Sequence, residues 1–220
     1  MRLYYRFARL CCQLFYVLFC RGRAVGTRHV PATGGVLLIA NHQSYLDPVI
    51  CTLALPRECS YMAKAPLFTH RLFRRLIESL NAFPVKEETA DVGAIKESLR
   101  RLRAGKALVI YPEGQRTFTG QIGSMFEGAL LVARRAKVPV VPTLIEGAFE
   151  AWPRWQRLPR RGWLVVAYGR PIPPDEVAAC SPPQLADRIR EELHGLQQPA
   201  RRIRAGCIHR SLHRPQVHGR

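Results

Sequence analysis

Short apolar runs alternate with amphipathic segments along the middle of the chain. Four runs predict buried strands, at residues 36–40, 107–111, 138–145 and 163–168. Segments with apolar residues at helical spacing predict four helices, at residues 64–80, 91–104, 124–137 and 182–197. Strands that alternate with helices predict an α/β fold, with a mainly parallel or mixed sheet flanked by helices. Ligands of such folds gather where loops leave the carboxyl ends of the strands.

The segment 91–104 carries a clear helical signal. Its apolar residues recur three and four positions apart, at Val92, Ile95, Leu99 and Leu102. Asp91 can cap the start of this helix, and Gly105 can end it. The boundaries of this helix are therefore predicted as well as its existence.

The first 20 residues have a different pattern. Polar residues at helical spacing share one face, and they are Arg2, Arg6, Arg9 and Gln13. Large apolar residues occupy the other faces, among them Leu3, Phe7, Leu10, Leu14, Val17 and Leu18. As a helix, residues 10–20 would span about 16 Å, against about 30 Å for the hydrocarbon core of a bilayer. We therefore expect residues 1–21 to form an interfacial membrane helix. A signal peptide, a single membrane span and a helix packed on its own domain remain alternatives.

The length of the chain, 220 residues, suits one domain with a full-sized core, which we assign to residues 22–197. No acidic residue follows Glu192, and the segment 198–220 is rich in Arg with little apolar patterning. We expect this segment to be a basic flexible tail.

The composition of the chain limits the classes of molecule that it is expected to bind. Lys and Arg number 34 against 16 for Asp and Glu, which gives a net charge of +18 and favours nucleic acid, anionic lipid or phosphorylated substrates. The seven cysteines are odd in number and form no C-x-x-C pair, so neither a disulfide framework nor a zinc ribbon is expected. They indicate reduced thiols in a cytosolic compartment.

The first candidate site is the sequence NHQSYLDP, directly after the predicted strand 36–40. His42 is a candidate general base, because its ordinary pKa lies near neutrality. Asp47 can fix the tautomer of the ring and stabilise its protonated form. No serine nucleophile is needed if the substrate brings its own hydroxyl. A purely structural alternative is that Ser44 and Asp47 form a capping box, or that Asp47 caps a helix beginning at Pro48.

The second candidate site is the sequence YPEGQRT, directly after the predicted strand 107–111. Gly114 permits a sharp turn and the close approach of a ligand. Arg116 offers a planar set of donors suited to phosphate, and Glu113 can orient Arg116 or the acceptor. An ordinary polar turn after a strand is the alternative for this cluster. Between the two clusters, Lys86 ends the short run AFPVK and can add a second cation.

The ordered set HQSYLD, FPVK, YPEGQRT and VPVVP resembles the glycerolipid acyltransferase superfamily, in particular bacterial 1-acyl-sn-glycerol-3-phosphate acyltransferases. The resemblance covers roughly residues 30–175. It implies that His42 and Asp47 form a catalytic dyad. It also implies that Glu113, Gly114 and Arg116 bind the acceptor phosphate, and that the block 140–142 lines the acyl site.

Two residues depart from the family pattern. Lys86 stands where the second block usually ends in Arg, which replaces a bidentate donor set with a point charge. Gln115 stands in place of the more usual Thr. These departures bear on the identity of the acceptor more than on the type of reaction.

The resemblance implies a transferase that moves an acyl chain from acyl-CoA or acyl carrier protein to the hydroxyl of 1-acyl-sn-glycerol 3-phosphate. Another lyso-lipid or amino-lipid acceptor, a member that binds lipid without turnover and, more distantly, a basic nucleic-acid-binding protein are alternatives. We expect no metal and no cofactor beyond the thioester co-substrate, because no metal-ligand motif, phosphate-binding loop or dinucleotide fingerprint is present in the sequence. Membrane lipids are the expected partners, nucleic acid is not, and the expected location is the cytoplasmic face of the cell membrane.

Overall fold

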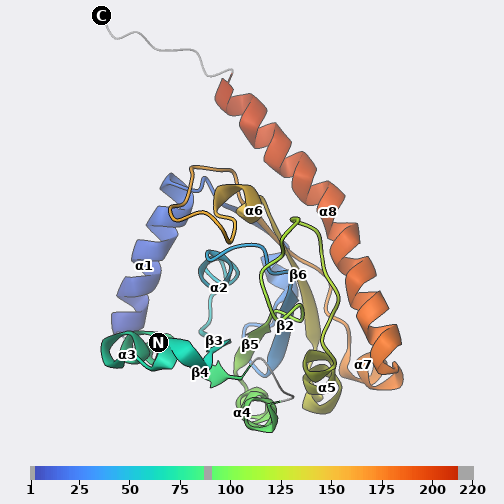
Figure 1. The fold of residues 1–220 in the computed structure, drawn as a ribbon. Coiled ribbons are helices and arrows are strands. Elements are labelled where there is room, and N and C mark those ends of the chain that lie inside the picture. The colour runs from blue at the N-terminus through green and yellow to red at the C-terminus, as the bar shows by residue number, and fades with distance from the viewer. Residues whose placement is uncertain (1–2, 87–90, 213–220) are drawn as a thin grey trace, which may run out of the picture.

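The computed structural model describes residues 3–86 and 91–212, and its centre is a seven-stranded sheet in the order β1-β7-β6-β2-β5-β3-β4 (Figure 1). The strands are β1 Arg23–Val25, β2 Val36–Ala40, β3 Cys59–Lys64, β4 Ala82–Val85, β5 Ala107–Ile110, β6 Val140–Glu146 and β7 Val165–Tyr168. All neighbouring pairs are parallel except β6 and β7. The sheet is therefore mixed and mainly parallel, which confirms the predicted fold class.

The helices are α1 Leu3–Leu18, α2 Asp47–Ile50, α3 Arg71–Ser79, α4 Val92–Arg103, α5 Glu127–Ala136, α6 Ala148–Ala151, α7 Pro174–Ala179 and α8 Pro182–Leu212. Two 3-10 turns lie at Thr27–His29 and Ala65–Phe68. Helices α4, α5, α7 and α8 cover one face of the sheet, and α1, α2 and α6 cover the other (Figure 1). The domain thus has three layers with a hydrophobic core on each side of the sheet.

Strand β2 shows how the sheet divides the core. Successive side chains of a strand point to opposite faces. Leu37 and Ile39 therefore pack with α4, α5 and α8, while Leu38 and Ala40 pack with α1 and α2. Both faces of β2 are buried, which explains why its sequence is an unbroken apolar run.

The structure confirms the four predicted strands and the helix α4, which Asp91 caps by accepting a hydrogen bond from the Ala94 N–H at 3.0 Å. The predicted helix 64–80 is wrong in its first part. Lys64 ends β3, a 3-10 turn with Pro66 in its first positions follows, and α3 begins only at Arg71. Strands β1, β3 and β4 were not predicted.

The segment from residue 198 to 212 is helical, so the predicted flexible tail is wrong over this range. It continues α8, whose Ala200 and Cys207 are buried against the domain. Arg204 Nη1 lies 2.8 Å from Glu150 Oε1 and 3.4 Å from Glu146 Oε1. Tertiary contacts therefore hold a segment whose composition alone suggested disorder. The rest of the predicted tail, 213–220, lies outside the described residues.

Helix α1 turns its polar face toward the domain. Arg9 Nη2 donates to the Leu53 carbonyl at 3.1 Å and also to the Leu55 carbonyl, and Gln13 Nε2 donates to the Leu53 carbonyl at 2.7 Å. The apolar face is exposed, with Phe7, Leu10, Leu14, Phe15, Val17 and Leu18 open to solvent. Within the described part of the chain, no helix combines the length and apolar character needed to cross a membrane.

Replacing Arg204 tests the attachment of α8. Arg204→Gln removes one of the two described cations of the buried Glu146, the other being Arg201 at 3.5 Å, and it also removes the contact with Glu150. We expect a loss of about 1–3 kcal/mol in the free energy of unfolding, measured by urea denaturation. The control is Arg202→Gln, at an exposed position of the same helix. Equal effects of the two variants would contradict the attachment.

Candidate active site

His42 lies just beyond the carboxyl end of β2 and pairs with Asp47. The ring Nδ1 lies 2.8 Å from Asp47 Oδ2, and the His42 side chain keeps 18% of its surface exposed while that of Asp47 has none. With Nδ1 donating to the carboxylate, Nε2 is the nitrogen left to accept a proton. The predicted pair is therefore present as a geometric unit, in which a buried carboxylate supports a partly exposed imidazole.

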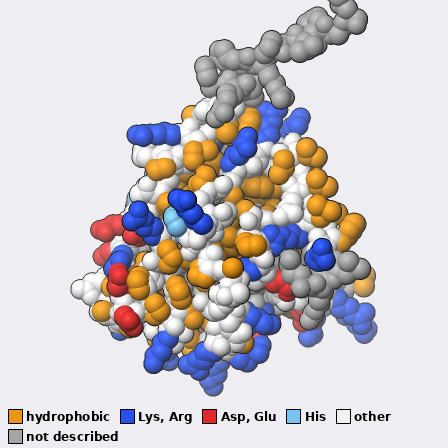
Figure 2. Space-filling view, turned by 180° about the vertical axis from the view of Figure 1, so that it is seen from behind, with side chains coloured by type: hydrophobic (Ala, Val, Ile, Leu, Met, Phe, Trp, Pro, Cys, Tyr) orange, Lys and Arg blue, Asp and Glu red, His pale blue; other side chains and the backbone are white. Residues whose placement is uncertain are grey.

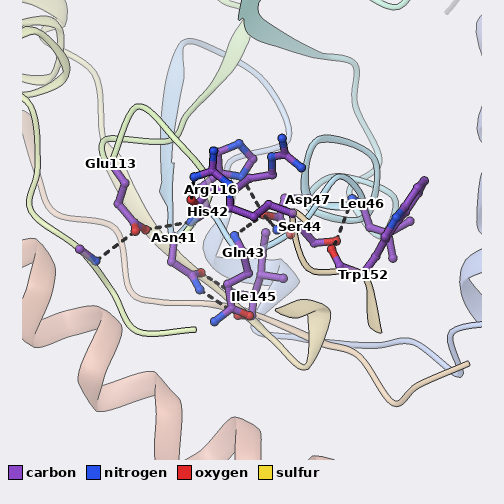
Figure 3. A network of polar contacts seen from close by, with 12 residues as sticks. Asn41, His42, Gln43, Ser44, Leu46, Asp47, Glu113, Arg116, Ile145 and Trp152 are labelled. Atoms are coloured by element: carbon purple, nitrogen blue, oxygen red, sulfur yellow. Dashed lines mark hydrogen bonds and ion pairs between the residues drawn. The ribbon is translucent and has the colours of Figure 1, made fainter. Parts of the chain in front are cut away.

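The Asp47 carboxylate also organises the main chain around the pair. Oδ2 accepts hydrogen bonds from the N–H groups of Gln43 and Ser44, at 2.5 and 2.7 Å. Asp47 is itself the first residue of α2, and the residue before that helix caps no N–H with its side chain. Asp47 therefore does not cap a helix that begins at Pro48. The reciprocal contacts of a capping box are present at Ser44 and Asp47, because Asp47 Oδ2 accepts from the Ser44 N–H and Ser44 Oγ accepts from the Leu46 N–H at 3.1 Å (Figure 3). This local role coexists with the pairing of Asp47 with His42.

Glu113 joins the loop after β5 to the loop after β2. Its Oε1 accepts a hydrogen bond from the His42 main-chain N–H at 2.9 Å, and its Oε2 accepts one from the Gly123 N–H at 3.0 Å. Burial raises the pKa of Glu113, and these two main-chain hydrogen bonds oppose that effect. Figure 3 shows the carboxylate on the side of His42 away from Asp47. Both oxygens are engaged by the protein, which favours a positioning role for Glu113 over contact with substrate.

Gly114 adopts a left-handed conformation, with φ of 68°. A Cβ at this position would lie 2.7 Å from the ring of Phe126. The turn after β5 therefore requires glycine for two reasons, the sign of φ and the close approach of an aromatic ring.

Arg116 lies flat on an aromatic ring beside the pair. Its guanidinium carbon is 3.4 Å from the centroid of the Tyr45 ring, and its buried Nη1 has no hydrogen-bond partner among the described residues. The next residue in the loop, Thr117, donates its N–H to the His42 carbonyl at 2.8 Å. The loop that carries Arg116 is thereby fixed to the residue that carries the imidazole.

Lys86 and the block 140–142 lie outside the group of residues around His42. Lys86 is exposed at the end of β4, two strands away from β5 in the sheet, where its N–H donates to Asp91 Oδ2 at 2.8 Å. Two strand spacings amount to roughly 10 Å. Val140 and Val141 are fully buried within β6. The structure thus brings His42, Asp47, Glu113, Gly114 and Arg116 together and leaves Lys86 outside this group.

Known proteins similar to this chain carry related names. The model of the acyltransferase family matches residues 22–146. A Bacillus subtilis protein named 1-acyl-sn-glycerol-3-phosphate acyltransferase is 26% identical over 83% of this chain and 94% of its own length. A Mycoplasma pneumoniae protein named as a probable enzyme of the same kind is 30% identical over 84% of this chain and 74% of its own length.

The chain belongs to the glycerolipid acyltransferase superfamily.

The fold agrees with this assignment. The 1-acyl-sn-glycerophosphate (LPA) acyltransferase of Thermotoga maritima superposes with a TM-score of 0.76 at 23% sequence identity, over 88% of this chain and 78% of its own. The match to the family model includes both the His42 loop and the Arg116 loop. The resemblance drawn from the four sequence blocks is therefore confirmed at the level of the superfamily.

Three further residues of the site escaped sequence reasoning. The Tyr111 ring stacks on the His42 ring with centroids 4.3 Å apart, and Asn41 bridges β2 to β6 through hydrogen bonds with both main-chain groups of Ile145. Arg154 donates to the Arg116 carbonyl at 3.3 Å. Tyr111 and Asn41 stand inside the recognised blocks, so their positions beside functional residues were the available signal. Arg154 lies in a later loop and gave none.

Replacing Glu113 separates positioning from substrate binding. Glu113→Gln turns one acceptor into a donor that faces a main-chain N–H, so the loop around His42 should shift. We expect kcat to fall about 10- to 100-fold, with a smaller change in the KM for the acceptor. Steady-state kinetics measure both, with Glu127→Gln at an exposed position as control. A rise confined to the KM for the acceptor would show instead that Glu113 binds substrate.

Proposed function

We propose that this protein transfers a fatty acyl chain from a thioester donor, acyl-CoA or acyl carrier protein, to the hydroxyl of 1-acyl-sn-glycerol 3-phosphate. The observation that carries the proposal is the placement of Arg116 beside the His42–Asp47 pair, on a loop that is hydrogen-bonded to His42. A cation that binds the acceptor phosphate there holds the acceptor hydroxyl near the base. The names of the relatives support the same acceptor.

His42 acts as the general base. Its Nε2 removes the proton of the acceptor hydroxyl as the oxygen attacks the thioester carbonyl carbon. Asp47 holds the ring in the required tautomer and stabilises the imidazolium that forms. When the tetrahedral intermediate collapses, the carbon–sulfur bond breaks, and the proton on His42 passes to the leaving thiolate. The products are the diacyl lipid and the free thiol, and the base is regenerated.

The acceptor hydroxyl attacks directly, without an acyl-enzyme. Ser44 is the hydroxyl nearest to His42 in the sequence, but its Oγ donates to the Trp152 carbonyl at 2.9 Å and accepts from the Leu46 N–H at 3.1 Å. A serine held by both of these groups serves the loop structure rather than nucleophilic attack. The substrate's own hydroxyl then remains as the nucleophile for His42.

The exposed face of α1 rests on the membrane that holds the lipid substrate. Its polar residues Arg9 and Gln13 are bound to the domain, while hydrophobic side chains gather on the side of the molecule where α1 lies (Figure 2). Helix α3 adds exposed Leu72, Phe73 and Leu76. An exposed apolar surface made of large side chains from two helices favours peripheral binding to lipid. The free cysteines support a reducing compartment, and so the cytoplasmic face of the membrane.

One experiment identifies the substrates. Purified protein is offered a panel of lyso-lipids and an amino-lipid with each type of donor, and the products are read by mass spectrometry. We expect phosphatidic acid from 1-acyl-sn-glycerol 3-phosphate as the dominant product. A dominant product from another acceptor would overturn the assignment of the acceptor and leave the reaction type intact.

Removal of the base should abolish catalysis without unfolding the protein. We expect His42→Ala to lower kcat by about 10²- to 10⁴-fold. Asp47→Asn should lower it by a comparable factor, because the amide no longer favours the required tautomer. Turnover is measured by product formation, and thermal melting serves as the folding control. Substantial turnover by a folded His42→Ala protein would contradict the mechanism.

Vesicle flotation tests the role of α1. Changing exposed Leu14 and Leu18 together to Glu should weaken binding to vesicles of mixed neutral and anionic lipid, because each large apolar side chain contributes roughly 1.5–3 kcal/mol when fully buried in the bilayer. High salt should weaken binding of the unchanged protein only in part, since the apolar contribution is insensitive to screening. The matched control is Val92→Glu, an exposed apolar position on α4. Equal flotation of both variants would rule out α1 as the anchor.

A further inference from the structure

The loop 152–163 reaches the candidate active site from the β6 side of β2, opposite to β5. It follows α6, which itself follows β6, the strand next to β2. The Trp152 carbonyl accepts a hydrogen bond from Ser44 Oγ at 2.9 Å, and Arg154 Nη1 donates to the Arg116 carbonyl at 3.3 Å. The start of this loop is therefore bound both to the His42 loop and to the Arg116 loop.

Arg154 and Arg116 are held in the same way. The Arg154 guanidinium carbon lies 3.8 Å from the centroid of the Phe118 ring, and that of Arg116 lies 3.4 Å from the centroid of the Tyr45 ring. Stacking on a ring covers one face of a guanidinium and leaves N–H donors at its edge free. Phe118 is two residues after Arg116, and Arg154 also contacts the Arg116 carbonyl, so both stacked cations are held on the loop that follows β5.

Neither guanidinium is neutralised by a carboxylate of the described residues. Other arginines of the domain are paired, such as Arg101 with Glu97 at 2.7 Å and Arg204 with Glu150 at 2.8 Å. No ion pair that involves Arg116 or Arg154 occurs within residues 3–86 and 91–212. Two unneutralised cations held on one loop favour an anion, and an anion that contacts both gains the attraction of each.

We propose that Arg154 is the second cation of the acceptor-phosphate site and works together with Arg116. This inference rests on the proposed function, because it assigns a residue to the phosphate of the acceptor. Arg154 takes the role that the sequence pattern suggested for Lys86, which lies two strands away from β5. The two guanidiniums bind different oxygens of one phosphate, and this geometry suits a planar donor set better than a lysine.

The placement of Arg154 also links phosphate binding to the base. Its contact with the Arg116 carbonyl and the bond from Thr117 N–H to the His42 carbonyl form a continuous connection from the second cation to His42. A phosphate held by both arginines is therefore held at a fixed distance from the imidazole.

The test compares four purified variants with the unchanged protein: Arg154→Gln, Arg154→Lys, Lys86→Gln and, as the matched control, Arg157→Gln, an exposed arginine of the same loop. Both kcat and KM are measured for the phosphorylated acceptor 1-acyl-sn-glycerol 3-phosphate, for the corresponding monoacylglycerol without phosphate, and for the donor. Inhibition by sn-glycerol 3-phosphate is measured as a second readout, and thermal melting checks folding.

We expect Arg154→Gln to raise the KM for the phosphorylated acceptor about 10-fold or more, with the KM for the donor unchanged. The KM for the monoacylglycerol should not change, and inhibition by sn-glycerol 3-phosphate should weaken by a similar factor. Arg154→Lys should fall between the unchanged protein and Arg154→Gln. Arg157→Gln and Lys86→Gln should each stay within about 2-fold of the unchanged protein.

The inference is overturned if Arg154→Gln acts no more strongly than Arg157→Gln, or if it changes the KM for both acceptors equally, which would indicate support of the loop alone. It is also overturned if Lys86→Gln shows the larger effect. The proposed function survives all these outcomes, provided that the unchanged protein prefers the phosphorylated acceptor. Absence of that preference in the unchanged protein would instead overturn the proposed acceptor and the role of Arg154 with it. If Arg154→Gln does not fold, the comparison of Arg154→Lys with Arg157→Gln decides between the same outcomes.

Discussion

One carboxylate oxygen, Oδ2 of Asp47, accepts hydrogen bonds from the His42 ring and from the N–H groups of Gln43 and Ser44. Asp47 has no exposed surface, so these donors are what offset the cost of burying its charge. The same three contacts fold the loop after β2 back on itself and fix the orientation of the imidazole. The His42–Asp47 pair and the local backbone are therefore one structure, and neither can be changed without the other.

The sheet extends this arrangement to the second loop. Strands β2 and β5 are parallel neighbours, so the loops that leave their carboxyl ends start side by side. Glu113 then binds the His42 N–H, and Thr117 binds the His42 carbonyl. The main-chain groups on both sides of the imidazole are thus held by the loop that carries Arg116. Proximity of the base and the cation follows from strand order together with these two bonds.

Local signals in the sequence predicted much of the fold and of the candidate site. The predictions failed where an element has no regular local pattern, or where its position depends on contacts distant along the chain. The apolar runs of β2, β5 and β6 are buried on both faces, and Asp91 caps α4, so the sequence of each of these elements has a regular pattern. Strand β4 contains Pro84 and lies at the sheet edge, and the segment before α3 is interrupted by Pro66, so neither has a regular pattern. The positions of Lys86 and Arg154 depend on strand order and on a later loop, which spacing along the chain does not encode. The helical segment after residue 198 depends on Glu146 and Glu150, distant acidic residues that balance its charge.

The attachment of α1 has a consequence for handling the protein in water. Because Arg9 and Gln13 are bound to carbonyls of residues 53–57, the helix cannot roll about its axis to hide its apolar side without breaking these hydrogen bonds. Tyr16 adds a further restraint, since its hydroxyl donates to the Arg23 carbonyl at 2.7 Å. In aqueous buffer the apolar strip stays exposed, so we expect separate molecules to associate along it unless a detergent micelle covers it. The expected colloidal behaviour and the proposed attachment to lipid thus share one origin, the fixed rotation of a single helix.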